Sequence, residues 1–454
     1  VRRDFDYWAD RQRRLSAAPM SESDAHALRQ EHRMLEERYA QVQAEIRRGS
    51  PRYAALAQPQ PLRLADIQLQ VLDEGTLLLE YALGEERSYL WAVSRKGHSS
   101  YVLPPRAPIE ELAGRVYAGL ADGSRPAEAV VREAAGRLSD ILLGPVAAEM
   151  SGRRLLVVAD GALQYIPFAA LPVPGRSGEP VPMIAEHEIV SLPSASVLAL
   201  LRREAAGRAA PPGSVAVLAD PVFEDDDPRE RAALRQAGAP GAPRRSARPK
   251  GAAGRSGTPA VILPRLPSTR EEADAIVEAA PPGTWLKRVG FDASRAAARD
   301  PALGRYRIVH FATHGVIDNE NPGQSGVFLS LFGHDGRAQA GLLSLQDIYG
   351  LRLPVDLVVL SACNTALGRP VRGEGLVGTV RGFMHAGARR VVASLWKVDD
   401  DATRELMRHF YAAMFRDRLP PAAALRQAQL AMRQQARWGA PFYWAAVVLQ
   451  GEWR

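Results

Sequence analysis

The chain has a single cysteine, Cys363, in 454 residues. One thiol excludes an internal disulfide, and a thiol-poor chain is typical of a reducing compartment. The sequence also lacks a charged-then-apolar leader and any apolar run of about 18 residues that could span a bilayer. We therefore expect a cytoplasmic protein. Because the chain begins with Val1 and not with methionine, we also expect it to be part of something longer.

Lysine is scarce as well. Only four of the 58 basic residues are lysines, and the formal net charge is +7. An arginine bias with abundant alanine is typical of a GC-rich bacterial genome. Nucleic-acid binding would instead require a basic stripe on a folded face, with aromatic residues between the charges. The dispersed charge favours a solvated surface, so we expect neither nucleic acid nor a membrane as a partner.

Three parts follow one another along the chain. Residues 1–60 predict a helical segment, with one amphipathic helix over Glu22–Arg48. Residues 61–210 mix strands and helices without a catalytic pair and are interpreted as a supporting domain. Residues 211–454 hold the cysteine and form the third part. Within it, the stretch 225–258 is rich in Pro, Gly, Ala and Arg and is predicted to be a disordered loop.

The hydrophobic pattern places the regular elements. In the supporting domain the predicted strands are Thr76–Ala82, Ser88–Ser94, Ser99–Leu103, Arg154–Ala159 and Ile189–Leu192, and the predicted helices are Ile109–Leu120 and Pro126–Leu143. In the third part the predicted strands are Ser214–Ala219, Trp285–Arg288, Tyr306–Ala312, Val355–Leu360, Arg390–Leu395 and Tyr443–Leu449. Its predicted helices are Arg270–Ala279, Ala293–Arg299, Ser344–Tyr349, Gly375–His385, Ala402–Phe415 and Ala422–Arg437.

This alternation of strands and helices predicts an α/β fold. Near-continuous hydrophobic strands indicate a mostly parallel sheet that helices cover on both faces. Ligands of such sheets bind at the carboxyl ends of the strands. His314 and Cys363 each follow the predicted end of a strand. If those two strands are neighbours, the imidazole and the thiol meet in one crevice.

Cys363 therefore has two interpretations. A lone cysteine at the end of a buried strand is often inert packing. As a nucleophile it would need a base, and His314 lies 49 residues before it, followed by a glycine. An imidazole can lower the pKa of a thiol or accept its proton. The backbone N–H groups of Gly315 and Cys363 would then stabilise the developing oxyanion.

Several motifs around these residues resemble those of a known family. They are His310-Phe311-Ala312-Thr313-His314-Gly315, Leu360-Ser361-Ala362-Cys363-Asn364-Thr365, Gly373-Glu374-Gly375-Leu376 and Ala393-Ser394-Leu395-Trp396-Lys397-Val398-Asp399-Asp400. This series is similar to the CHAT domain, a bacterial caspase-like and separase-like family of cysteine peptidases of clan CD. The resemblance extends over roughly residues 62 to 454.

The resemblance implies a caspase-like (caspase-hemoglobinase) fold with Cys363 as the nucleophile and His314 as the general acid/base. It also implies that residues 61–210 are an inactive, pseudo-caspase-like unit. Family members often carry tetratricopeptide repeats upstream as a sensor, but no repeat of about 34 residues survives here. Roles in bacterial defence or programmed cell death, and gasdermin-like protein substrates, are further expectations from the resemblance.

Aspartates at two places in the chain are candidates for substrate recognition, Asp220 and, in the later run, Asp399 or Asp400. In caspase-like enzymes the pocket for the residue before the scissile bond is built where Asp220 and the run Asp399-Asp400-Asp401 lie here. A carboxylate there would favour arginine or lysine, and the loop 225–258 offers arginines for self-processing. Alternatively, Asp399 or Asp400 caps the helix that begins near Ala402, or one caps and another recognises substrate.

No cofactor and no metal is expected. His310 and His314 are four residues apart, but they lie on a strand and lack the glutamate of a zinc-binding helix. Gly373-Glu374-Gly375 lacks the third glycine of a dinucleotide loop. Two functions thus remain open: a regulated cysteine endopeptidase, or a non-catalytic scaffold that binds a partner protein in the crevice.

Overall fold

The computed structural model describes residues 59–122, 128–176, 178–224, 227–229, 263–318, 322–367 and 375–454, with Met34, and for some of these, 362–367 among them, only the backbone. The predicted helix Glu22–Arg48 lies outside these residues except for Met34, which is helical and exposed. The chain divides into two compact units, Val1–Pro61 and Leu62–Arg454. The second unit carries every element discussed below.

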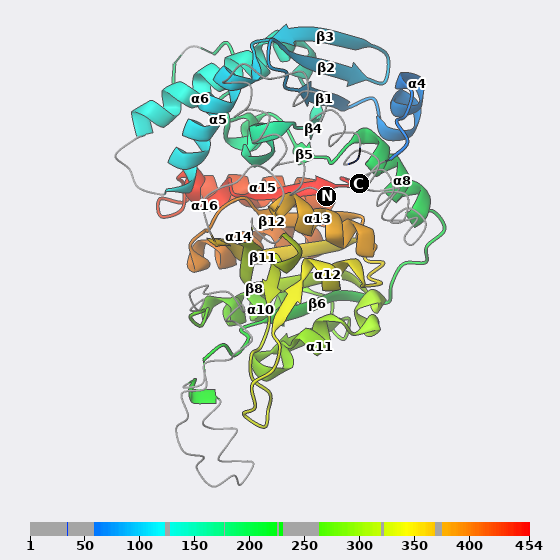
Figure 1. Ribbon diagram of the computed structural model, residues 1–454, viewed down its shortest axis with the longest axis vertical. Helices are drawn as coiled ribbons and strands as arrows, with labels where there is room; N and C mark the ends of the chain where they lie inside the picture. The colour runs from blue at the N-terminus through cyan, green and yellow to red at the C-terminus, as the bar shows by residue number, and fades with distance from the viewer. Residues whose placement is uncertain are drawn as a thin grey trace. The chain divides into compact units, whose positions relative to one another are not determined.

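One mixed sheet runs through the second unit (Figure 1). Its strands are β1 (Thr76–Ala82), β2 (Ser88–Ser94), β3 (His98–Leu103), β4 (Arg154–Val158), β5 (Ile189–Ser191), β6 (Gly213–Ala219), β7 (Trp285–Val289), β8 (Tyr306–Asp318), β9 (Gly326–Phe328), β10 (Leu342–Ser344), β11 (Leu357–Leu367), β12 (Arg390–Ser394) and β13 (Val447–Gly451). The α-helices are α4 (Leu64–Asp66), α5 (Arg106–Ala121), α6 (Glu128–Leu142), α7 (Ala147–Met150), α8 (Ala195–Ala205), α10 (Ser268–Ala279), α11 (Arg295–Ala298), α12 (Leu345–Tyr349), α13 (Gly375–Ala386), α14 (Asp400–Phe415), α15 (Pro421–Arg433) and α16 (Pro441–Trp444).

The sheet has two halves that meet at β13 and β5. Residues 76–191 supply the order β3-β2-β1-β4-β5, and later residues supply β7-β6-β8-β11-β12-β13. In the second half, β7, β6, β8, β11 and β12 are parallel, whereas β13 runs antiparallel to β12. A parallel pairing of Gln450 with Ser191 joins the halves. The predicted fold class, α/β with a mostly parallel sheet flanked by helices, is confirmed.

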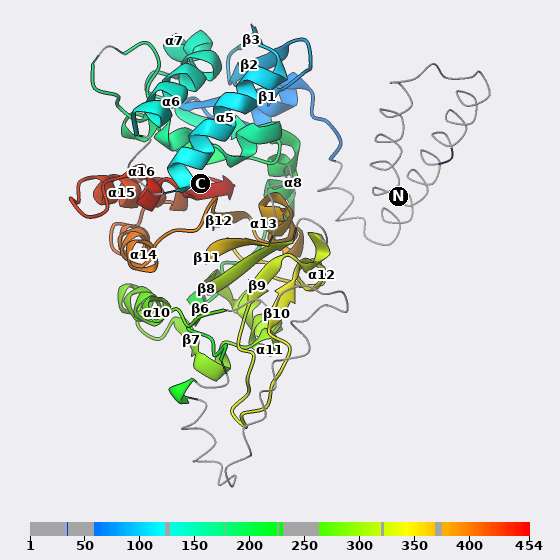
Figure 2. The same cartoon turned by 60° about the vertical axis from the view of Figure 1, so that its left-hand side comes forward.

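Successive residues of β8 identify the helices on each face of the second half. His310 contacts Glu272 of α10 and Tyr411 of α14, whereas the ring of Phe311 packs against Phe383 of α13. Because side chains alternate along a strand, α10 and α14 cover one face and α13 covers the other. Figure 2 shows the strands β6, β8 and β11 between these two groups of helices.

Two central strands are longer than the pattern predicted. We expected them to end at Ala312 and Leu360, but β8 continues to Asp318 and β11 continues to Leu367. The reason is that their partners change along their length. Strand β6 pairs with β8 only as far as Ala312, and β9 then takes the same side of β8 at Gly315. The extension rests on these tertiary pairings, which hydrophobic periodicity does not reveal.

Other boundaries differ at proline-rich or polar positions. The last strand begins at Val447 and not at Tyr443, because Pro441 starts a short helix, α16, before it. Helix α15 ends at Arg433, before the predicted Arg437, and α8 was not predicted. Of the stretch 225–258 that we expected to be disordered, only 227–229 is described, and there Asp227 is buried. Among the described residues, no helix is long and apolar enough to cross a membrane.

An ion pair holds the C-terminal end of the sheet to the first half. Arg202 of α8 donates from Nε to Oε2 of Glu452 at 2.5 Å and from Nη2 to Oε1 at 3.1 Å. Its Nη1 also donates to the carbonyls of Gln70 and Val71, at 2.7 and 2.8 Å. The guanidinium lies 4.3 Å from the ring centroid of Trp453. Burial alone would raise the pKa of Glu452, but the hydrogen bonds and charge of Arg202 outweigh it and hold the pKa below its usual range.

We expect Arg202→Ala to lower the free energy of unfolding by about 3 kcal/mol at pH 7, because it leaves a buried carboxylate unpaired. The folded-state pKa of Glu452 is lowered, so this contribution is present above the unfolded pKa of about 4.3 and is lost as the pH falls through the folded value. Urea denaturation at several pH values measures the effect. The exposed neighbour Arg203→Ala is the control, and equal losses in both variants would contradict the prediction.

Candidate functional site

The parallel register of β8 and β11 brings the two predicted catalytic positions together. Cys363 is the ladder partner of His314, and the strands are neighbours, as the sequence analysis required. Residues paired in a parallel ladder project to the same face of the sheet. Both residues lie inside extended strands and not past their ends, but the flanking strands stop short, since β6 pairs only to Ala312 and β12 only to Leu360. The pair therefore lies beyond the ends of β6 and β12.

The imidazole of His314 is held on one nitrogen only. Its Nε2 lies 2.6 Å from the carbonyl oxygen of Pro264. A carbonyl accepts and cannot donate, so this contact assigns the proton to Nε2 and leaves Nδ1 as the basic nitrogen. Nδ1 is buried and has no hydrogen-bond partner among the described residues. The ring of Phe223 packs on the imidazole with centroids 5.1 Å apart.

The surroundings of His314 also set its charge. Its side chain is only 4% exposed. Burial lowers the pKa of His314 below its usual range, and the positive charge of Lys397 lowers it further, against the opposing effect of the hydrogen bond to Pro264. A lowered pKa keeps the imidazole neutral at pH 7, which is the form that accepts a proton.

Gly315 lies within β8, where it pairs with Val327 on one side and Asn364 on the other. The oxyanion role of the backbone N–H groups of Gly315 and Cys363 stays a prediction. Gly315 nevertheless lies next to His314 at the position where β9 first pairs with β8.

A small polar hollow adjoins the His314–Cys363 pair on the face covered by α10 and α14. Its lining residues are Leu266, Thr269, Glu272, Thr313, Ser361, Ser394, Asp400 and Thr403. Ser361 is two residues before Cys363 and so projects to the same face of β11. The Oγ of Ser361 is buried without a hydrogen-bond partner in the described part of the chain. The hollow therefore lies beside Ser361, two residues before Cys363 on β11.

Asp400 and Glu272 place two carboxyl groups in the lining of this hollow. Burial raises the pKa of Asp400, and the negative charges of Asp399 and Glu272 raise it further. Glu272 is 2% exposed, and its Oε1 lies 2.8 Å from Nε2 of His310. The Nδ1 of His310 is 2.9 Å from the hydroxyl oxygen of Tyr411. His310 is thus buried between Glu272 and Tyr411. The described residues contain no group of three or more potential metal ligands.

The structure decides one of the two tasks that the sequence left open for these aspartates, the capping of the helix. The carboxylate of Asp399 accepts a hydrogen bond from the backbone N–H of Ala402 at 3.0 Å and caps α14. Asp400, the next residue, lines the hollow. Asp399 therefore caps the helix, and recognition of a substrate by Asp400 stays a prediction.

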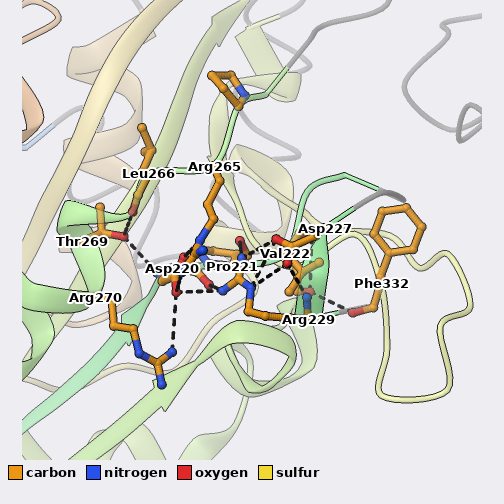
Figure 3. A network of polar contacts seen from close by, with 12 residues as sticks. Asp220, Pro221, Val222, Asp227, Arg229, Arg265, Leu266, Thr269, Arg270 and Phe332 are labelled. Carbon is orange, nitrogen blue, oxygen red and sulfur yellow. Dashed lines mark hydrogen bonds and ion pairs between the residues drawn. The ribbon is translucent and has the colours of Figure 1, made fainter. Parts of the chain in front are cut away.

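Asp220 does not line the hollow. Its carboxylate is fully buried and surrounded by arginines of this chain (Figure 3). Arg265 donates to both carboxylate oxygens, at 2.9 and 3.0 Å, and Arg229 lies 2.7 Å from Oδ2. Arg270 makes a longer contact of 3.5 Å. With its lone pairs taken in this way, Asp220 is an ion-pair partner within the protein and not a free carboxylate that faces a substrate.

Two residues of the site, Pro264 and Glu272, were not predicted from the sequence. Pro264 acts through its carbonyl, and a backbone group carries no sequence signal. Glu272 did carry one, since it lies on the apolar face of α10 with the buried residues Thr269, Ala273 and Ile276. An acidic residue on the buried face of an amphipathic helix is rare unless it is paired, and this exception indicates a polar site.

A family model described as the CHAT domain matches residues 132–452. Tetratricopeptide repeat protein 28 of Mus musculus and that of Homo sapiens are each 30% identical over 179 residues, which covers 33% of this chain and 7% of theirs. The chain therefore spans a small part of the length of these relatives.

Two solved structures are similar over most of the chain. The separase–securin complex of Saccharomyces cerevisiae matches with a TM-score of 0.47 and 9% identity, over 86% of this chain and 30% of that one. The Arg-specific cysteine proteinase gingipain R matches with a TM-score of 0.42 and 9% identity, over 76% of this chain and 74% of that one.

Because Cys363 is the only cysteine, alkylation reports on that position alone. We expect His314→Gln to slow alkylation by iodoacetamide about tenfold at pH 7, since a neighbouring base increases the thiolate fraction. In the unsubstituted protein this assistance persists below pH 6.5 and is lost only below the lowered pKa of His314. The exposed His334→Gln is the control, and equal rates in all three proteins would disprove the coupling.

Proposed function

The chain belongs to the CHAT domain family, and from this premise we propose that it is a regulated, caspase-like cysteine endopeptidase. The observation that carries the proposal is the ladder pairing of Cys363 with His314. The imidazole supports it because Pro264 holds the proton on Nε2 and Nδ1 stays basic in a buried position. In a histidine that only fills the core, both ring nitrogens are expected to be paired, whereas Nδ1 has no partner among the residues that the structure describes.

In the proposed reaction, Nδ1 of His314 accepts the thiol proton as Sγ of Cys363 attacks the carbonyl carbon of the substrate. The carbonyl oxygen becomes an oxyanion near the backbone N–H groups of Gly315 and Cys363. His314 then gives its proton to the leaving nitrogen, the C–N bond breaks, and an acyl-enzyme forms. Water, deprotonated by the same imidazole, hydrolyses the thioester and regenerates the thiol.

We further propose that the hollow beside Cys363 takes a basic side chain before the scissile bond. Support comes from the carboxyl groups of Asp400 and Glu272, which lie within one small polar site together with the hydroxyl of Ser361. A guanidinium or ammonium group would satisfy these acceptors through charge-assisted hydrogen bonds. A neutral side chain would leave the buried carboxyl of Asp400 without a cationic partner, which is costly.

The natural substrate is proposed by class only. A protein chain fits the site, with a gasdermin-like protein or the arginine-containing loop 225–258 as candidates. The relatives named for tetratricopeptide repeats support an upstream repeat domain as the regulator, since this chain spans 7% of their length. We propose action in a bacterial cytoplasm, in defence or programmed cell death.

A Cys363→Ala variant should lose all cleavage of a protein that the unsubstituted chain cleaves, because it removes the only thiol. Mass spectrometry of new protein termini measures the cleavage. A matched control is Ser100→Ala, which removes an exposed hydroxyl in β3 and keeps the nucleophile. Retained cleavage in Cys363→Ala would leave the scaffold function, with partner binding in the crevice, as the better account.

For specificity, we expect Asp400→Asn to reduce the preference for arginine over glutamine before the scissile bond by about tenfold, because one charge-assisted contact is lost. The ratio of the two kcat/KM values for fluorogenic peptides measures this preference. Asp399→Asn is the matched control, since asparagine also caps helices well and the charge change is the same. An unchanged ratio in Asp400→Asn would refute the assignment of the hollow.

A further inference from the structure

The buried carboxylate of Asp220 occupies a position that the proposed reaction does not use. It follows β6 directly, with φ at +49°, a conformation that aspartate and asparagine adopt more readily than most residues. Its backbone N–H lies 3.1 Å from Oγ1 of Thr269, and its carbonyl accepts from the N–H of Gly290 at 3.1 Å and from Arg229 at 2.9 Å. Main chain and side chain are therefore both fixed.

Arg265 links this carboxylate to the imidazole. Its guanidinium donates from Nε to Oδ1 and from Nη2 to Oδ2 of Asp220, the two-pronged geometry that best fixes an arginine (Figure 3). The preceding residue is Pro264, whose carbonyl accepts the proton of His314 Nε2. Arg265, which is anchored on Asp220, is therefore the residue directly after the carbonyl that accepts the hydrogen bond of His314.

The segment that starts at Asp220 supports the other side of the ring. Phe223 packs on the imidazole of His314, and the carbonyl of Val222 accepts from the backbone N–H of Leu331 at 2.8 Å. Asp227 holds Arg229 through a further ion pair of 2.6 Å. The imidazole therefore lies between two segments, 220–223 and 263–266, and Asp220 is the point at which they are joined.

We propose that Asp220 is a positioning residue for His314. Through Arg265 it fixes the carbonyl of Pro264, and through its own segment it fixes Phe223, so that the imidazole is held in one orientation. The inference rests on the proposed peptidase function for its kinetic consequence only. The position of the ring itself is a property of the unliganded protein.

Asp220→Asn keeps the size of the side chain and tolerates the positive φ, but it removes the charge that holds Arg265. We expect kcat for a cleaved peptide to fall about tenfold with KM unchanged, since the substrate pocket is untouched. We also expect the Nε2–H proton of His314 to lose its slow exchange with solvent in NMR of protein labelled with ¹⁵N-histidine. The resonance is assigned by its absence in His314→Gln.

Arg270→Gln is the matched control, because it removes a charge from the same cluster through a longer contact at a side chain that is 45% exposed. We expect it to change neither kcat nor the Nε2–H exchange. Arg265→Lys retains the charge but not the two-pronged contact, and we expect an intermediate effect on both. It also keeps the test open if Asp220→Asn does not fold, as judged by circular dichroism.

The NMR result separates this inference from the proposed function. Rapid exchange of Nε2–H in folded Asp220→Asn or Arg265→Lys, with slow exchange in Arg270→Gln, supports the positioning role even in a chain that cleaves no peptide. Unchanged exchange and unchanged kcat in both folded variants would overturn the role, while leaving the peptidase function intact. A rise in KM with constant kcat would also overturn it, because it would assign Asp220 to substrate binding.

Discussion

The parallel ladder between β8 and β11 is the constraint on which the rest of the site depends. It runs without interruption from the pairing of Ile308 with Leu357 to that of Asp318 with Leu367. Because side chains alternate with a period of two, a slip of one residue would turn the cysteine to the opposite face from the histidine. The strands on either side, β6 and β12, hold this register where the sheet is fully buried and then stop before the pair.

Burial around the His314–Cys363 pair changes the pKa values of the groups near it. The histidine stays neutral because burial and a nearby lysine lower its pKa, and a backbone carbonyl sets its tautomer. On the same face, the carboxyl groups of Asp400 and Glu272 line a small hollow. The arginines around Asp220 satisfy a third buried charge and connect it to the carbonyl of Pro264.

Much of this could be predicted from the sequence, because local patterns carried the signal. The bounds predicted for Thr76–Ala82 and Ser88–Ser94 agree with β1 and β2, and the apolar runs located the parallel strands. The lone cysteine and the histidine 49 residues before it indicated two positions that the sheet pairs with each other. The pattern failed where a partner strand decides the outcome, as in the extension of β8, and where a proline begins a helix, as in α16.

By itself, the sequence determined the fold class, the order of most elements and the two residues that pair in the central ladder. It did so because hydrophobic periodicity and residue chemistry are local properties of the chain. Only the tertiary structure decided which nitrogen of His314 stays basic, which aspartate caps α14 and which lines the hollow, and why Asp220 is paired with arginines. These outcomes depend on carbonyls, burial and charges supplied by segments distant in sequence, as with Pro264, which is 50 residues from the histidine that it holds.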